Sequence, residues 1–185
     1  MKKIMAVLLA AALVFPCFAA KKKGTKVGVS MPTKDLQRWN QDGANMKAQL
    51  EKAGYSVDLQ YANNDIATQV SQIENMVTSK CKVLVIASID GSALKGVLDQ
   101  ARKKKIPVIA YDRLIMNSKA VSYYATFDNY KVGTIQGDYL VDKLGLKTRS
   151  ASDPVYMEFF TGDPGDNNIN FFFGGAMDVL KPYLD

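Results

Sequence analysis

The chain has 185 residues, of which 48% are apolar, 24 are Lys or Arg, and 18 are Asp or Glu. This length suits one ordinary domain, or one domain and part of another, and the apolar content is enough for a buried core. The chain contains no histidine. The absence of histidine excludes Ser-His-Asp and Cys-His catalysis and most zinc sites.

The net charge of +6 comes from the beginning of the chain. From residue 27 onward the sequence has 18 basic and 18 acidic residues, so this part is neutral. A nucleic-acid-binding protein needs a basic patch on its folded surface, and we therefore expect no nucleic-acid partner. The six basic residues that precede it are Lys2, Lys3, Lys21, Lys22, Lys23 and Lys26.

Residues 1–20 have the pattern of a secretory signal peptide. Lys2 and Lys3 precede an apolar run at residues 4–15, and small residues follow up to Ala20. The apolar run is too short for a transmembrane helix. We expect cleavage after Ala19 or Ala20 and release of a periplasmic protein.

The chain has two cysteines, Cys17 and Cys81, for which we expect different roles. Val14-Phe15-Pro16-Cys17 is a degenerate form of the lipoprotein box, so acylation of Cys17 is an alternative to release. We favour release because Phe15 and Pro16 are bulky for that box. Cys81, at the start of an apolar segment, is expected to be a small buried hydrophobe rather than a nucleophile.

Strand and helix patterns alternate from residue 26 onward. Strand patterns are short and almost continuously apolar, whereas helix patterns carry apolar residues at a spacing near 3.6. This alternation predicts an α/β fold with a doubly wound parallel sheet. The expected strands are 26–31, 55–61, 82–87, 106–111, 121–127 and 155–160, and the expected helices include 39–53, 66–77, 92–101, 132–140 and 170–182.

A polar segment at 147–154 is the best candidate for a linker between domains. We expect a first lobe at residues 25–151 and the start of an incomplete second lobe at 155–185. A single strand and helix cannot bury their own apolar faces, which is why the second lobe is expected to be incomplete. The alternative is that residues 155–185 dock on the first sheet as a last unit.

Polar residues follow the predicted strands, and in a parallel sheet the carboxyl ends of the strands share one edge, where ligands bind. The run at residues 106–111 ends in Asp112 and Arg113, which together can accept from and donate to paired hydroxyl groups. An ordinary ion pair at the end of a strand is the alternative. Asp90 follows the preceding strand in the same way.

Trp39 is the only tryptophan of the chain. Its indole could stack on the C–H face of a sugar ring, or it could be the first core contact of its helix. The loop at 162–168 lacks the spacing of a phosphate-binding loop and the ligand order of an EF-hand. Its Asp166 and Asn168 suit hydrogen bonding to a polyol, and one residue of this loop is expected to cap the helix that follows.

Three segments together resemble the periplasmic sugar-binding proteins of bacterial ABC importers, in the branch of the xylose-binding and multiple-sugar receptors. These segments are VIAYDRLI at 108–115, FDNYKVG at 127–133, and GDPGDNN at 162–168 followed by GAMDVLKP at 175–182. The Arg38-Trp39 pair fits the same branch. The resemblance covers the chain from about Lys26 to its last residue.

The resemblance implies two α/β lobes hinged around a sugar, with no cofactor and no catalytic residue. It also implies a monomeric receptor. The partners of this receptor would be a pentose or hexose ligand and the membrane subunits of an ABC permease, with a chemosensor as a further partner. The residues that it places in contact with the sugar are Arg38, Trp39, Asp90, Asp112, Arg113, Asp166, Asn168 and Phe173.

Two other classes of function remain as alternatives. One is the effector domain of a sugar-responsive transcription regulator, which shares this fold but carries a DNA-binding segment where this chain has its signal peptide. The other is a carbohydrate-processing enzyme, for which the carboxylates of Asp112 and Asp166 would have to perform the chemistry.

Overall fold

The computed structural model describes residues 24–150 and 152–184. The predicted signal peptide and Cys17 lie outside the described residues. Five strands of the described residues form one parallel sheet in the order β2-β1-β3-β4-β5. The predicted α/β fold with a doubly wound parallel sheet is confirmed. The strands are β1 (Lys26–Met31), β2 (Ser56–Tyr61), β3 (Val83–Ile86), β4 (Val108–Tyr111) and β5 (Val121–Ala125).

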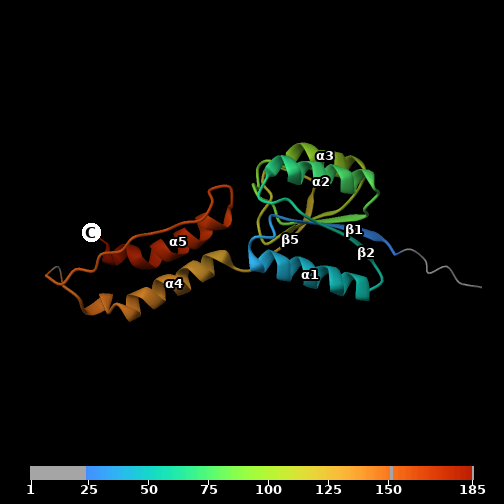
Figure 1. Ribbon diagram of the computed structural model, residues 1–185. Helices are drawn as coiled ribbons and strands as arrows, with labels where there is room; N and C mark the ends of the chain where they lie inside the picture. The colour runs from blue at the N-terminus through green and yellow to red at the C-terminus, as the bar shows by residue number, and fades with distance from the viewer. Residues whose placement is uncertain (1–23, 151, 185) are drawn as a thin grey trace, which may run out of the picture.

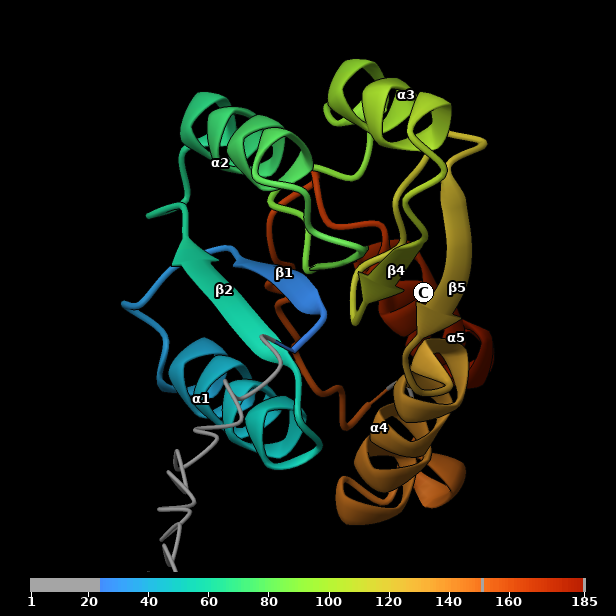
Figure 2. The same cartoon turned by 90° about the vertical axis from the view of Figure 1, so that its right-hand side faces the viewer.

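Helices cover both faces of the sheet, as Figures 1 and 2 show. Helix α1 (Gln37–Lys52) lies on one face, and α2 (Ile66–Thr78) and α3 (Lys95–Lys103) lie on the other. Two apolar clusters fill the spaces between the layers, one around Trp39 on the α1 side and one around Leu84 on the α2 and α3 side. Strands buried on both faces explain the nearly continuous apolar runs in the sequence.

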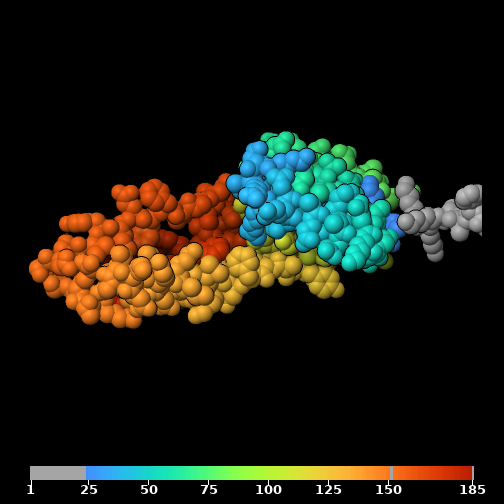
Figure 3. Space-filling view, turned by 60° about the horizontal axis from the view of Figure 1, so that its bottom comes forward, coloured from blue at the N-terminus to red at the C-terminus, as the bar shows by residue number. Residues whose placement is uncertain are grey.

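The two helices at the C-terminal end pack on each other. They are α4 (Asn129–Lys143) and α5 (Asn168–Leu180), and short 3-10 helices at Leu146–Thr148 and Lys181–Tyr183 follow them. Together they project from the part that contains the sheet (Figures 1 and 3). Helices α1 to α3 therefore pack on the sheet, whereas α4 and α5 pack on each other. The change between these two arrangements lies at residues 126–128, ahead of the polar segment at 147–154.

Residues 155–160, which the sequence predicts to be a strand, are not one in the structure. No neighbouring strand offers backbone groups to this segment within the described residues, and a strand needs such a ladder. Two of its aromatic residues are also exposed to solvent, since Tyr156 is 92% exposed and Phe160 is 90% exposed. The prediction of a strand at residues 155–160 is therefore wrong, because an apolar pattern is local whereas strand pairing is a tertiary property.

Local features agree with the sequence pattern. Asp65 caps α2, because its carboxylate accepts a hydrogen bond of 2.6 Å from the Thr68 N–H, and this bond lowers the pKa of Asp65. Cys81 lies in the core, where burial raises the pKa of its thiol. None of the helices in residues 24–150 and 152–184 is long and apolar enough to cross a membrane.

A buried amide ties the carboxyl ends of β1 and β3 together. The Gln69 side chain donates to Ser30 Oγ at 3.1 Å and to the Ala87 carbonyl at 3.0 Å, and it accepts from the Ile89 N–H at 2.9 Å. Gln69 is fully buried, so a water molecule cannot readily replace these bonds.

We expect Gln69→Leu to lower the free energy of unfolding by about 1–3 kcal/mol, because it leaves the Ile89 N–H and the Ala87 carbonyl buried without this partner. Urea unfolding of the two proteins measures the difference. Gln100→Leu, on the exposed surface of α3, is the matched control and should change the stability little. Equal losses in the two variants would contradict the role assigned to Gln69.

Candidate functional site

A cavity of about 290 Å³, lined by both charged and apolar residues, lies at the carboxyl ends of β4 and β5. In an open parallel sheet this is the edge at which ligands bind. The volume is near the lower end of the range for small-molecule pockets. The cavity is lined by the beginning of α1 and by the ends of the two strands, through Arg38, Tyr111, Asp112, Ala125, Thr126 and Phe127.

Asp112 and Arg38 form an ion pair on the wall of this cavity. One amino group of the Arg38 guanidinium donates to Asp112 Oδ2. The carboxylate is buried, with 5% of the side chain exposed, whereas 51% of the Arg38 side chain is exposed. The pair therefore presents an acceptor and a set of planar donors side by side, with the guanidinium open to the solvent.

Asp42 and Tyr111 hold Arg38 from its other side. Arg38 Nε lies 3.5 Å from Asp42 Oδ2, and the Tyr111 hydroxyl donates to the same oxygen at 3.1 Å. Burial works against the charged guanidinium, but the hydrogen bond to Asp112 and the nearby carboxylates raise the pKa of Arg38. Burial and the bond to Asp42 raise the pKa of Tyr111. Arg38 thus stays charged and Tyr111 stays protonated at neutral pH.

Arg113 points to a different set of groups. Its Nε lies 2.9 Å from Asp166 Oδ2, and its Nη1 donates to the carbonyls of Ser88 and Ile89 at 3.2 and 3.3 Å. Arg113 and Asp166 are largely buried, with 18% and 17% of their side chains exposed. This ion pair joins the end of β4 to the loop before α5, so residues 53 positions apart in the sequence meet here.

Trp39 lies beneath both arginines. Its side chain is 3% exposed and belongs to the core cluster with Val29 and Met31. The guanidinium carbons of Arg38 and Arg113 lie 4.8 and 5.5 Å from the centre of its ring, within the range of cation–π contacts. The structure therefore places Trp39 in its core role, and the indole contacts the two site arginines rather than the cavity.

Asn168, the first residue of α5, is also buried and faces Asp112. Its Nδ2 donates to the Asp112 carbonyl at 3.2 Å and lies 3.4 Å from Asp112 Oδ1. Asp166 Oδ1 accepts from the Asn168 N–H at 3.0 Å, so the predicted polar loop satisfies the beginning of the helix. Asp112, Asn168 and the Arg113–Asp166 pair therefore form one connected group.

Asp90 and Phe173, by contrast, do not line the cavity that holds Arg38 and Asp112. Asp90 accepts from the N–H and the hydroxyl of Ser92, both at 2.7 Å, and these bonds lower the pKa of Asp90. The Phe173 ring packs edge-on against Phe159 with the ring centres 6.0 Å apart.

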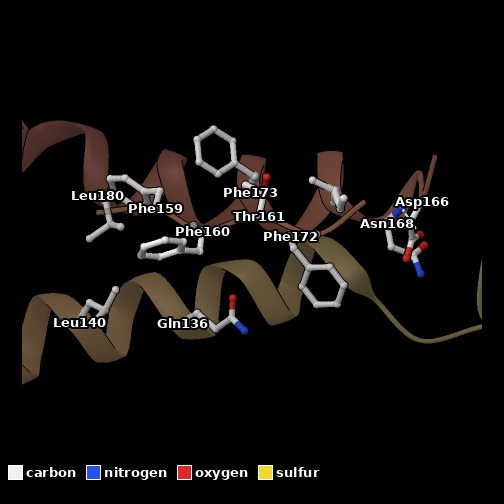
Figure 4. Close-up of a pocket in the computed structure, with 13 residues that line it drawn as sticks. Gln136, Leu140, Phe159, Phe160, Thr161, Asp166, Asn168, Phe172, Phe173 and Leu180 are labelled. Carbon is white, nitrogen blue, oxygen red and sulfur yellow. Dashed lines mark hydrogen bonds between the residues drawn. The ribbon is translucent and has the colours of Figure 1, made fainter. Parts of the chain in front are cut away.

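A second, mainly apolar cavity of about 440 Å³ lies between α4, α5 and residues 159–162. Figure 4 shows Asp166 and Asn168 together at one end of it, away from Leu140 and Leu180. Phe173 lies at this cavity. Within residues 24–150 and 152–184, no group of three or more Cys, Asp or Glu side chains could hold a metal ion.

Five residues of the cavity that holds Arg38 and Asp112, and of its surroundings, are not among the site residues predicted from the sequence. Tyr111, Ala125, Thr126 and Phe127 line the cavity but belong to the strands expected at 106–111 and 121–127, and Asp42 lies on the polar face of a helix. The position of Asp42, four residues after Arg38, was the available indication, because residues at this spacing are neighbours on a helix.

The fold and the cavity together define the class of the protein, an α/β protein with a cavity at the carboxyl edge of a parallel sheet. A family model described as "Periplasmic binding protein domain" matches residues 27–185, and the chain belongs to this family. The family resemblance seen in the sequence is confirmed.

Curated relatives extend beyond the chain. The multiple sugar-binding periplasmic receptor ChvE of Rhizobium radiobacter is 55% identical over 190 residues, which cover 100% of this chain and 52% of that protein. The D-xylose-binding periplasmic protein of Escherichia coli is 38% identical and aligns with 96% of this chain and 51% of that protein. The chain thus spans about half the length of these relatives.

A solved structure is also similar to this chain. An ABC transporter solute-binding protein from Clostridium phytofermentans, with bound β-D-glucose, is 71% identical, with a TM-score of 0.82. The match covers 85% of this chain and 48% of that protein.

Proposed function

We propose that this chain contributes the sugar-binding site of an extracytoplasmic receptor that captures a monosaccharide for an ABC transporter. The observation that carries the proposal is the Arg38–Asp112 pair on the wall of the cavity at the ends of β4 and β5. A carboxylate accepts from a sugar hydroxyl while a guanidinium donates to its neighbour, which is the chemistry that a ring of hydroxyl groups requires. The relatives named for sugars support the same ligand class.

In the proposed mechanism no covalent bond is made or broken. A sugar that enters the cavity exchanges hydrogen bonds with Arg38 and Asp112, which in its absence satisfy each other. The Arg113–Asp166 pair joins the strand end to the loop before α5 and can transmit occupancy to α5. Closure of two lobes around a ligand is a common way to report occupancy to a partner.

The proposal includes two lobes, a permease as partner, a monomeric receptor and a periplasmic location. The relatives ChvE and the D-xylose-binding protein are themselves named periplasmic. The sequence predicts the boundary between the lobes at 151–155, whereas the packing of α4 on α5 favours a boundary at 126–128. The boundary stays a prediction, as do the signal peptide and the alternative of a lipid at Cys17.

Titration of the chain with D-glucose and with D-xylose into the millimolar range tests the proposal. Trp39 fluorescence is the first readout, because a sugar that draws Arg38 away changes the charge 4.8 Å from the indole. We expect a saturable change, together with NMR shifts at Arg38, Asp112 and Thr126. A disaccharide, which is larger than either monosaccharide, tests whether the response depends on the size of the ligand. A folded chain with a flat response to every monosaccharide would contradict the proposal.

A further inference from the structure

The backbone of Asp112 has an uncommon conformation at the centre of the site. Its φ is 62°, in the left-handed region, which non-glycine residues seldom occupy and Asp tolerates better than most. The Asp112 N–H donates to the Ala125 carbonyl at 2.8 Å, and the next N–H, that of Arg113, donates to the Tyr111 carbonyl at 2.7 Å. A conformation of this kind persists only where the surrounding structure fixes it.

Three side chains converge on the Asp112 carbonyl oxygen. The Thr126 hydroxyl donates to it at 3.0 Å, the Tyr124 hydroxyl at 3.1 Å and Asn168 Nδ2 at 3.2 Å. A carbonyl oxygen has two lone pairs, so three donors exceed its ordinary complement. This number of donors on one main-chain oxygen fixes the orientation of the peptide that follows Asp112.

The same donors belong to a network that joins three segments. Asn129 Nδ2, at the start of α4, lies 3.4 Å from Thr126 Oγ1 and donates to Asn168 Oδ1 at 3.2 Å. The network is buried at Asn129 and Asn168, where hydrogen bonds are difficult to replace by water. The Asp112 peptide is thus held by the end of β5 and by the beginning of α5.

We propose that the hydroxyl groups of Thr126 and Tyr124 are positioning groups for Asp112. They hold its main chain in the left-handed conformation, and this conformation directs the carboxylate to Arg38 and to the cavity. This inference rests on the proposed function, because it assigns the two hydroxyls to sugar recognition through Asp112.

Thr126→Val and Tyr124→Phe remove the two hydroxyls with little change of shape. We expect D-glucose or D-xylose affinity, whichever the wild type binds, to fall about fivefold in each variant and further in the double variant. Such losses are typical of one neutral hydrogen bond. Thr126→Ser, which keeps the hydroxyl, should restore most of the affinity. Tyr123→Phe, on the same strand with 69% of the residue exposed, is the control and should bind as the wild type does.

Amide hydrogen exchange without sugar distinguishes this inference from the proposed function. The Asp112 amide should exchange faster in the double variant, while amides of β1 and β3 keep their wild-type rates. Faster exchange in a chain that binds no sugar would support the positioning and refute the proposed function. Lower affinity with unchanged exchange would overturn the inference, because the hydroxyls would then act on the sugar directly. Unchanged affinity and unchanged exchange would overturn it as well.

Discussion

Asp112→Ala is expected to lower sugar affinity by about 10- to 100-fold and also to destabilise the chain. The affinity falls because the variant removes a charged acceptor from the cavity, and hydrogen bonds to charged groups contribute about 1.5–3 kcal/mol. The stability falls because alanine in the left-handed region costs roughly 1–2 kcal/mol. The variant also removes the carboxylate partner of Arg38.

Two companion variants separate the backbone effect from the charge effect at this position. Asp112→Gly relieves the left-handed backbone but has no carboxylate, so it should unfold at a higher temperature than Asp112→Ala and still bind sugar poorly. Asp112→Asn tolerates the same backbone and keeps an acceptor, so its loss of affinity reports the charge alone. Thermal unfolding and calorimetric titration with D-glucose and D-xylose measure both quantities. Wild-type affinity in all three variants would show that Asp112 does not take part in sugar binding.

Gly175→Ala is expected to separate α5 from α4 and to lower the free energy of unfolding by about 1–3 kcal/mol, which is typical of overpacking. A methyl group at Gly175 would overlap the carbonyl oxygen of Tyr130 and would lie 3.0 Å from the Thr134 amide nitrogen. These atoms belong to the backbone of α4, so no rotation of a side chain can relieve the contact.

The adjacent glycine provides a matched control for this prediction. A methyl group at Gly174 would meet no atom within 4 Å. Gly174→Ala should therefore raise the stability by up to about 1 kcal/mol, because alanine has the higher helix propensity. Urea unfolding compares the two variants with the wild type. Destabilisation of the same size in both would show that the position in the helix, rather than the contact with α4, determines the effect.

The order along the chain of the five paired strands and of the helices, and the edge at which the candidate site lies, could be predicted from the sequence alone. Nearly continuous apolar runs such as 83–86 and 108–111 are typical of strands covered on both faces, and helical periods between them imply parallel connections. The position of Asp112 directly after β4 then placed it at the ligand edge. These inferences depend on local periodicity and on chain connectivity, which the sequence contains.

Only the tertiary structure showed which polar residues at this edge contact one another and which apolar segments pair with a neighbouring strand. Arg38 and Asp112 are 74 positions apart, and no local pattern indicates that they form a pair. The burial of Trp39, the left-handed backbone of Asp112 and the missing ladder of residues 155–160 likewise depend on neighbours that are distant in the sequence. Apart from residues 155–160, the sequence thus determined the elements of this protein and their order, while packing between distant residues determined the geometry of the candidate site.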